Sequence, residues 1–321
     1  PRVRRLPPLA GQPTRQQRVI AEALAGKRIA VTGGTGFLGT ALLERLLRSV
    51  PGCEVVALVR PGKRTSAAER ARREVLRNDC FDRLRSELGD RFDAEIARRF
   101  TVVAGDVTAD NLGLSDDDLA IFCSVDVVIH SAAAVSFDSP LDGAVEVNLL
   151  GPVRVATALR DAGSRAHLVA VSTAYVAGLR RGDAPEAELA DTPFSTDVDW
   201  RAEVDAARRA RADTDAESRR PEHLTRFTKR ARAELGAAGA PLLAEKTERL
   251  RADWVKDQLV ELGRGRARAL GWPDAYAYTK ALGERALAQT RGDVPVTIVR
   301  PSIIESALAE PKPGWIRGFR M

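Results

Sequence analysis

Cysteine is scarce in this chain of 321 residues, which contains only three. Cys53, Cys80 and Cys123 lie far apart, and no pair has the short spacing of a zinc site. An odd, unclustered set of thiols is typical of a protein from a reducing compartment. We therefore expect free thiols, no metal site and a location in the cytoplasm.

Long apolar runs and aromatic residues are also few. No stretch approaches the roughly 20 apolar residues of a membrane-spanning helix, and none has the pattern of a signal peptide. The chain is basic, with a formal net charge of +6, but aromatic residues make up only 5% of it and no base-stacking or groove-reading motif is present. The charge therefore favours a small polyanionic ligand over a nucleic acid.

A glycine-rich run at residues 32–39, with the sequence TGGTGFLG, carries most of the functional information. It joins an apolar, strand-like run to a helix-like one, which is the arrangement that holds the pyrophosphate of a dinucleotide. Gly33 allows a tight turn, Gly36 lets the backbone approach a phosphate, and Gly39 lets the helix pack closely on the strand. A surface turn that collects glycines is the alternative. The residues expected at the cofactor are Thr32, Gly33, Thr35, Gly36, Phe37, Leu38 and Gly39.

The end of the next strand-like run, residues 54–59, favours NADPH over NADH. A site specific for NADH has an acidic residue at this point, where it binds the ribose 2′-hydroxyl. This chain has Arg60 instead, followed by Lys63 and Arg64. Cations suit a 2′-phosphate, and an arginine can pair with it through two hydrogen bonds. A solvated basic turn is the alternative.

Two further strand ends supply candidate cofactor contacts. Residues 100–104 lead into Asp106 and Val107, and an aspartate there commonly reaches the adenine amino group, although it can equally cap a turn. Residues 125–130 end at His130, which we expect to be a packed residue and not a base or ligand. Small residues then leave room for a ribose or a flat ring. These are Ser131, Ala132 and Ala133.

A tyrosine and a lysine four residues apart form the candidate catalytic pair. Tyr276 and Lys280 fall on one face of a helix-like run. A cation beside a phenol lowers the pKa of the phenol, and such a tyrosine can donate or accept a proton near neutral pH. A hydroxyl at the end of the fifth strand, residues 167–171, can hydrogen-bond the same substrate oxygen. Tyr278 lies only two residues from Lys280, so it points elsewhere.

Together these motifs resemble the extended short-chain dehydrogenase/reductases and, within them, the bacterial alcohol-forming fatty acyl-CoA reductases. The resemblance covers roughly residues 26–315 and includes the last two runs, which are VRPSIIES at 299–306 and EPKPGWI at 310–316. General sugar epimerases lack the last of them. The resemblance implies NADPH as the cofactor and long-chain acyl-CoA as the substrate, reduced to the aldehyde and on to the alcohol.

The resemblance also implies roles for individual residues. Thr173, rather than Ser172, matches the residue that polarises the substrate carbonyl. Tyr276 would be the proton donor, and Lys280 would tune Tyr276 and bind the ribose. Asn148 matches a buried asparagine near the lysine, with an ordinary helix asparagine as the alternative. The other cofactor contacts implied are Pro301, Ser302 and Ile303.

The alternation of strand-like and helix-like runs predicts an α/β fold with a doubly wound parallel sheet. We expect an arm or linker over residues 1–25, a Rossmann core over 26–178 and a charged helical insertion over 179–270. The catalytic helix, the sixth strand and the start of a substrate domain occupy 271–321, and most of that substrate domain is expected to be absent.

The insertion has two parts. Residues 201–220 are so polar that they predict a solvated helix or a disordered arm. Apolar residues then recur at helical spacing between 242 and 262, which indicates an amphipathic helix. A helix packed on its own core, a lid over an acyl tunnel and a peripheral contact with a membrane surface are the three interpretations.

Other functions share parts of this pattern. A nucleotide-sugar epimerase or dehydratase uses the same three catalytic residues on a sugar carbonyl. The terminal reductase domain of a carboxylic acid reductase or peptide synthetase acts on a carrier-bound thioester. A scaffold that only binds NADPH would have a broken set of catalytic residues, and here the set is intact.

Overall fold

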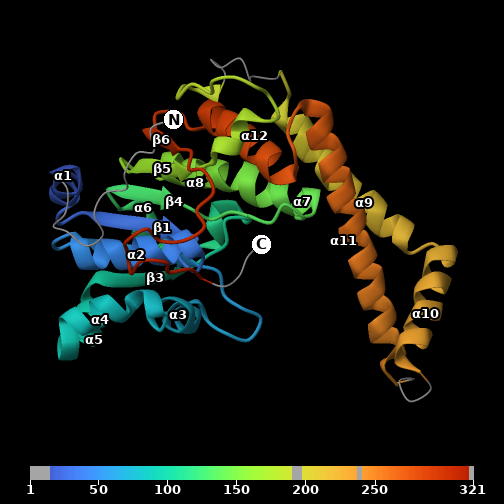
Figure 1. The fold of residues 1–321 in the computed structure, drawn as a ribbon, viewed down its shortest axis with the longest axis horizontal. Coiled ribbons are helices and arrows are strands. Elements are labelled where there is room, and N and C mark those ends of the chain that lie inside the picture. The colour runs from blue at the N-terminus through green and yellow to red at the C-terminus, as the bar shows by residue number, and fades with distance from the viewer. Residues whose placement is uncertain (1–14, 190–196, 237–240, 318–321) are drawn as a thin grey trace. The chain divides into compact units, whose positions relative to one another are not determined.

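Six parallel strands form the central sheet, in the order β3-β2-β1-β4-β5-β6 (Figure 1). This is the strand order of a doubly wound dinucleotide-binding fold, so the predicted fold class is confirmed. The computed structural model describes residues 15–189, 197–236 and 241–317. The strands are β1 (Arg28–Thr32), β2 (Glu54–Val59), β3 (Phe100–Ala104), β4 (Val127–His130), β5 (His167–Val171) and β6 (Val296–Val299).

The strands form where the sequence has short runs rich in valine and isoleucine. β1 and β2 are buried from their second residue to their last. Parallel strands that are covered on both faces need such continuous apolar runs, because neither face meets water. Each strand begins and ends within two residues of the run that the sequence predicts.

The chain divides into two compact units. The first comprises residues 1–132, 154–172 and 290–321, and it contains the whole sheet. The second comprises residues 133–153 and 173–289. The predicted catalytic helix therefore groups with the helical insertion.

Helices of the first unit pack on the sheet through an apolar core, in which Leu43 and Phe81 join Ile29 and Val55. Arg99 donates hydrogen bonds of 2.7 to 3.0 Å to three backbone carbonyls at and just beyond the end of α2, where carbonyls lack helical partners. α1 lies within the stretch predicted as an arm. The helices are α1 (Arg15–Ala23), α2 (Phe37–Ser49), α3 (Ala67–Ala71), α4 (Asp82–Leu88), α5 (Phe92–Arg99) and α6 (Asp116–Cys123).

All three cysteines are buried free thiols. Burial raises the pKa of Cys53 to about 11, of Cys80 to about 12 and of Cys123 to about 11. The thiols therefore stay protonated at neutral pH, and a protonated thiol is a poor nucleophile and metal ligand. Within the described residues, no group of three or more His, Cys, Asp and Glu side chains is placed to hold a metal ion.

The second unit is mainly helical. The polar segment that the sequence predicts as a solvated helix or a disordered arm is the helix α9, and it has a buried face: Trp200, Val204 and Ala207 pack in one cluster with Leu282 of α12. The helices are α7 (Leu141–Ala144), α9 (Trp200–Ser218), α10 (Pro221–Leu235), α11 (Leu243–Leu270) and α12 (Ala275–Thr290), with α8 (Leu150–Asp161) divided between the units.

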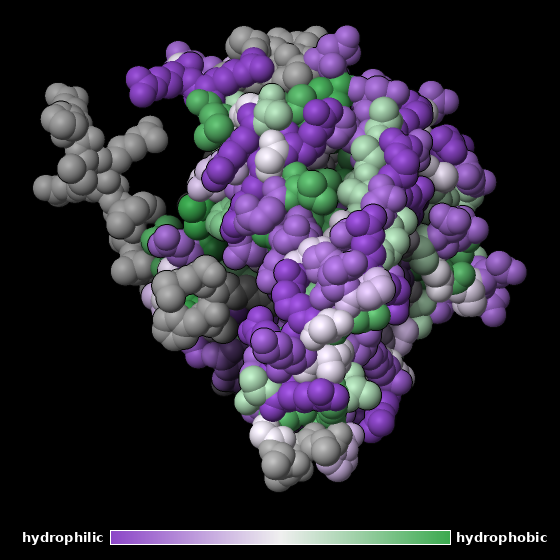
Figure 2. Space-filling view, turned by 90° about the vertical axis from the view of Figure 1, so that its right-hand side faces the viewer, coloured by the Kyte–Doolittle hydropathy of each residue, from purple (hydrophilic) through white to green (hydrophobic). Residues whose placement is uncertain are grey.

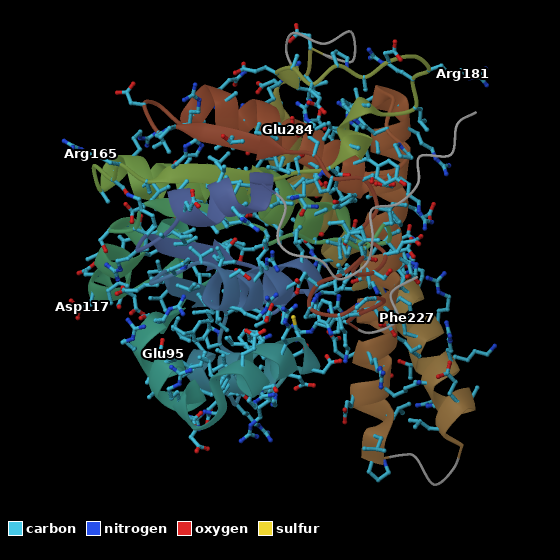
Figure 3. All side chains as sticks on the ribbon, turned by 60° about the vertical axis from the view of Figure 1, so that its left-hand side comes forward. Glu95, Asp117, Arg165, Arg181, Phe227 and Glu284 are labelled. Atoms are coloured by element: carbon cyan, nitrogen blue, oxygen red, sulfur yellow. The ribbon has the colours of Figure 1, made fainter. Side chains whose placement is uncertain are left out.

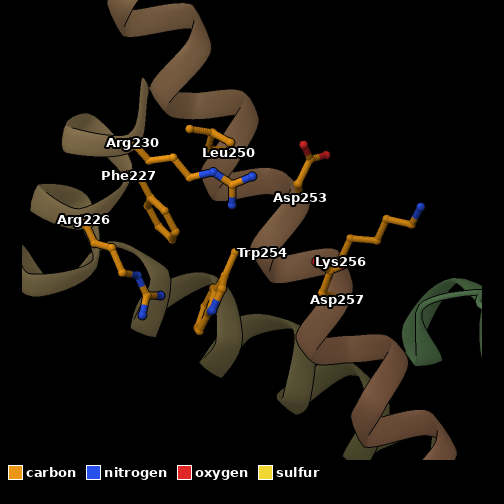
Figure 4. A pocket seen from close by; sticks show the side chains of 8 residues that line it. All are labelled: Arg226, Phe227, Arg230, Leu250, Asp253, Trp254, Lys256 and Asp257. Carbon is orange, nitrogen blue, oxygen red and sulfur yellow. The ribbon is translucent and has the colours of Figure 1, made fainter. Parts of the chain in front are cut away.

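α10 and α11 form a hairpin with a small apolar cluster of its own, which contains Phe227, Ala231 and Leu250 (Figure 3). A surface hollow of about 620 Å³ lies between the two helices, where charged side chains surround Phe227 and Trp254 (Figure 4). The face that α9 and α11 present is mostly hydrophilic, with separate apolar spots (Figure 2). Every described helix is too short or too polar to cross a bilayer.

Candidate active site

The glycine turn of the first unit lies between β1 and α2. Gly33 has φ +74°, and a Cβ atom there would lie 2.6 Å from the backbone nitrogen of Ala132. A Cβ atom on Gly39 would lie 2.2 Å from the carbonyl oxygen of Gly33. Gly36 caps α2 without a side-chain hydrogen bond, and the first turn of this helix has no acidic residue. The turn thus leaves backbone amides at a helix N-terminus to bind an anion, which fits a dinucleotide pyrophosphate.

The strand ends next to this turn are tied together by polar contacts. Thr32 is fully buried, and its hydroxyl oxygen lies 2.8 Å from Nδ1 of His130 and accepts a hydrogen bond of 3.2 Å from the Ala132 amide. Ser131 donates its hydroxyl proton to the Thr32 carbonyl at 2.7 Å. His130 is 1% exposed, so it is the packed histidine that the sequence predicts.

Asp106 caps its own turn. Its Oδ1 accepts hydrogen bonds from the amide and the hydroxyl of Thr108, at 2.9 and 2.8 Å. Its Oδ2 lies 3.6 Å from Nη1 of Arg60, whose side chain is 66% exposed. The neighbouring Val107 is buried. In this structure the aspartate therefore has the turn-capping contacts that the sequence left as an alternative.

The other candidate cofactor residues differ in their exposure. Lys63 and Arg64 are exposed after the end of β2. Residues 301–303, which are Pro301, Ser302 and Ile303, follow β6 without regular structure, and Ile303 is 60% exposed. These residues all belong to the first unit, whereas Ala133 and Asn148 belong to the second.

Thr173 and Tyr276 meet in the second unit. The Thr173 hydroxyl hydrogen-bonds the phenol of Tyr276 and also accepts a hydrogen bond of 3.2 Å from the Tyr175 amide. Thr173 is 4% exposed. Phe137 packs edge-on against the Tyr276 ring, with the ring centres 6.0 Å apart, and against Tyr175 at 6.5 Å. The structure therefore brings together the two hydroxyls that the sequence assigns to the substrate oxygen.

The pKa of Tyr276 differs from the sequence expectation. Burial raises the pKa of this phenol, and the hydrogen bond from Thr173, which lowers it, is the smaller effect. The sequence predicts a lowered pKa from the i, i+4 lysine, but spacing says nothing about desolvation, which disfavours the phenolate. The phenol of Tyr276 is therefore protonated at neutral pH.

Lys280 is buried one turn further along α12. Burial lowers the pKa of its ammonium group to about 8, although the Glu284 carboxylate acts in the opposite direction. Glu284 lies on the same helix, one more turn along (Figure 3). Both side chains are 6% exposed. Lys280 thus carries a positive charge that is lost in a mildly alkaline solution.

Asn148 connects the loop after β4 to α12. Its Oδ1 accepts a hydrogen bond from the Ala134 amide at 2.9 Å, and its Nδ2 donates to the Ala134 carbonyl at 3.0 Å and to the Thr279 hydroxyl at 3.2 Å. It lies in a π-helical turn, Val145–Leu149, and is 1% exposed. A Cβ atom on Gly283 would lie 2.4 Å from the Asn148 carbonyl oxygen. Asn148 is therefore buried beside the residue preceding Lys280 and is not an ordinary solvated helix asparagine.

Tyr278 has a different environment from Tyr276. Its hydroxyl donates a hydrogen bond to the carboxylate of Glu203 on α9, which also accepts hydrogen bonds from Arg266 on α11. Burial, together with the hydrogen bond to Glu203, raises the pKa of Tyr278 far above its ordinary value. Burial alone would raise the pKa of Glu203, but the hydrogen bonds from Arg266 and Tyr278 hold it below its ordinary value. The phenol of Tyr278 thus stays protonated at neutral pH, and through Glu203 it links α12 to α9.

Comparison with known proteins identifies the family of this chain. A family model described as Male sterility protein, an NAD-binding type, matches residues 31–321. The chain belongs to the male sterility protein family. The matched region includes the glycine turn, α12, β6 and the EPKPGWI run.

Curated relatives of this family member carry the name that the sequence resemblance predicts. Fatty acyl-CoA reductase 2, chloroplastic, of Arabidopsis thaliana is 34% identical over 306 residues, which cover 94% of this chain and 45% of that protein. The alcohol-forming fatty acyl-CoA reductase of Simmondsia chinensis is 34% identical, with 94% and 56% covered. The resemblance to the fatty acyl-CoA reductases is thereby confirmed, and the chain spans about half the length of these relatives.

Among solved structures, the chain is similar to the terminal R domain from the myxalamid PKS-NRPS biosynthetic pathway. The TM-score is 0.49 and the identity is 24%, over 87% of this chain and 49% of that domain. A likeness of this degree has no bearing on the substrate.

Proposed function

We propose that this family member reduces the thioester of long-chain fatty acyl-CoA with NADPH, first to the aldehyde and then to the alcohol. The observation that carries the proposal is the hydrogen-bonded pair of hydroxyls, that of the buried Thr173 and that of the half-buried Tyr276, with Lys280 one turn along α12. The names of the relatives supply the substrate class. The free, buried thiols support the cytoplasm as the location.

The proposed chemistry follows from these side chains. NADPH, when bound, supplies a hydride. Thr173 and Tyr276 hydrogen-bond the thioester oxygen and stabilise the negative charge that develops there. When the resulting hemithioacetal anion collapses, its oxygen becomes the aldehyde carbonyl, the carbon–sulfur bond breaks and coenzyme A leaves as the thiolate, which takes a proton from water. In the second reduction Tyr276 donates its proton to the aldehyde oxygen, which becomes the alcohol hydroxyl.

The assay that tests this function counts NADPH oxidised per coenzyme A released from a long-chain acyl-CoA. Two NADPH per coenzyme A is the result expected for reduction to the alcohol. One per coenzyme A would remove the second step from the proposal. No oxidation with acyl-CoA, together with turnover of an acyl chain on a carrier protein, would contradict the proposed substrate.

A preference for NADPH is supported by Arg60, Lys63 and Arg64, which stand where an acid would bind the ribose of NADH. We expect Arg60→Gln to reduce kcat/KM for NADPH by about tenfold and to leave that for NADH unchanged, because a charge-assisted hydrogen bond contributes about 1.5–3 kcal/mol. Arg73→Gln is the control, since the Arg73 side chain is 63% exposed in the same unit. Equal kcat/KM values of the unchanged protein for the two cofactors would contradict the preference.

The pH dependence is expected to follow Lys280. Because burial lowers its pKa to about 8, the ammonium group is present below that pH and is lost as the pH rises through it. We therefore expect kcat/KM to fall on the alkaline side of about pH 8. Glu284→Gln removes the carboxylate that favours the ammonium form, so the fall should move to lower pH. Glu261→Gln, an exposed glutamate of α11, is the control. An identical pH profile for all three proteins would contradict the role of Lys280.

A further inference from the structure

Two aromatic side chains are exposed where the second unit holds its pair of hydroxyls. Phe137 and Tyr175 are 50% and 39% exposed, whereas Trp272 and Tyr278 of the same unit are almost fully buried. Val135, which lies in the same loop as Phe137, is exposed as well. Exposed apolar side chains that lie together mark a binding surface more often than scattered ones do.

Phe137 connects this exposed surface to the phenol of Tyr276. Its ring packs edge-on against the Tyr276 ring, at an angle of 80° and with the ring centres 6.0 Å apart. It packs in the same way against Tyr175, at 84° and 6.5 Å. Both contacts together still leave half of Phe137 exposed. An apolar surface therefore begins next to the ring whose hydroxyl Thr173 contacts.

The loop after β4 holds Phe137 in place from both sides. Before it, the Asn148 side chain hydrogen-bonds the amide and the carbonyl of Ala134, at 2.9 and 3.0 Å. Around it, residues 136–139 form a turn that is closed by a backbone hydrogen bond of 3.1 Å. Phe137 is thus exposed in a fixed loop, and a preformed surface loses less conformational entropy when a ligand binds.

The chemistry of this surface decides which part of the substrate it fits. A thioester whose carbonyl is bound by Thr173 and Tyr276 has the acyl chain on one side of that carbonyl and the sulfur of coenzyme A on the other. The acyl chain is apolar, whereas the arm of coenzyme A carries amides and phosphates, which lose hydrogen bonds to water against apolar side chains. The charged neighbour of Phe137 in the chain, Asp138, pairs with Arg264 of α11, so the two charges offset each other. The surface therefore suits the acyl chain.

We propose that Phe137 is a specificity-determining residue, which contacts the first carbons of the acyl chain while Thr173 and Tyr276 bind the thioester carbonyl. The proposal rests on the proposed function, which supplies the position of that carbonyl. Phe137 should favour an acyl group of several carbons over an acetyl group, because each methylene group that leaves water stabilises the complex. A residue that only supported the Tyr276 ring would act equally on acyl groups of every length.

The test compares acetyl-CoA, hexanoyl-CoA and dodecanoyl-CoA in binding and in turnover by the whole chain. Titration calorimetry in the presence of NADP⁺, which has no hydride to transfer, measures binding without reaction. We expect Phe137→Ala to lower the affinity for hexanoyl-CoA relative to acetyl-CoA by about tenfold, which corresponds to lost contact with two methylene groups. The fall for dodecanoyl-CoA should be no larger, because its further carbons lie beyond Phe137. The ratios of kcat/KM with NADPH should change by the same factor.

Phe137→Leu keeps an apolar side chain and should retain most of the preference for the longer acyl groups. Leu224→Ala is the matched control, because Leu224 is an exposed apolar residue of the same unit, on α10. It should leave all the ratios unchanged.

Unchanged ratios in Phe137→Ala, including an equal loss for all three acyl groups, or an equal fall in Leu224→Ala would overturn the proposal. Failure of the unchanged protein to bind any of the three would overturn it together with the proposed substrate. Binding with the expected preference but without reduction would contradict the proposed function and leave this inference standing.

Discussion

Tyr276→Phe is expected to reduce the turnover of acyl-CoA by about 10²–10⁴-fold, which is the usual contribution of a positioned proton donor. The substitution keeps the ring that packs against Phe137 and removes only the hydroxyl that Thr173 contacts. The affinity for NADPH should therefore change little. Single-turnover kinetics and cofactor titration on the same preparation measure the two effects separately.

Tyr278→Phe is the matched control, since it makes the same change two residues away on α12. It removes the hydrogen bond to Glu203, and a buried hydrogen bond lost in this way costs about 1–3 kcal/mol. Glu203 keeps its hydrogen bonds from Arg266. We therefore expect a lower free energy of unfolding with turnover retained. An inactive Tyr278→Phe beside an active Tyr276→Phe would show that the tyrosine roles are exchanged.

The sequence predicts those parts of the fold that depend on neighbours along the chain. A strand buried on both faces must be largely apolar, so β2 can be recognised in the sequence as a run of valines and leucine. The glycine turn can be predicted because glycine is required where a Cβ atom would clash with nearby backbone or where φ is positive. Both conditions hold at Gly33. Tyr276 and Lys280 are visible because their spacing is that of one helical turn.

Contacts between residues far apart in sequence could not be predicted in this way. Glu203 meets Arg266 and Tyr278, which are 63 and 75 positions away, and nothing in the local pattern of any of the three indicates the others. The spacing of the apolar residues in α9 did carry a signal: Trp200, Val204 and Ala207 recur at i, i+4 and i+7. The polar composition around them concealed it.

The remaining differences between the predicted and the observed site arise from the burial and the hydrogen bonds of individual side chains. The lysine spacing predicts a lowered pKa for Tyr276, but its desolvation raises that pKa. Asp106 shows the same limit, because only the structure shows that its carboxylate is already engaged by Thr108. The number of hydrogen bonds that a side chain accepts and the water that it loses are properties of the folded chain.

Gly39→Ala is expected to remove most of the cofactor binding. The new Cβ atom would lie 2.2 Å from the Gly33 carbonyl oxygen and 2.7 Å from its carbonyl carbon, and backbone atoms cannot yield as a flexible side chain can. α2 must then move away from the glycine turn, which separates the amides at its N-terminus from the turn that shapes the pyrophosphate site. We expect an affinity for NADPH at least about tenfold lower and a loss of about 1–3 kcal/mol in the free energy of unfolding.

Gly265→Ala separates this clash from the general effect of alanine in a helix. Gly265 lies within α11, is exposed, and a Cβ atom there would have no neighbour within 4 Å. Alanine is favoured over glycine in a helix by about 1 kcal/mol, so this variant should be more stable and bind NADPH normally. Cofactor titration and denaturant unfolding of both variants provide the comparison. Normal NADPH binding by Gly39→Ala would show that the close approach of α2 to Gly33 is not what forms the site.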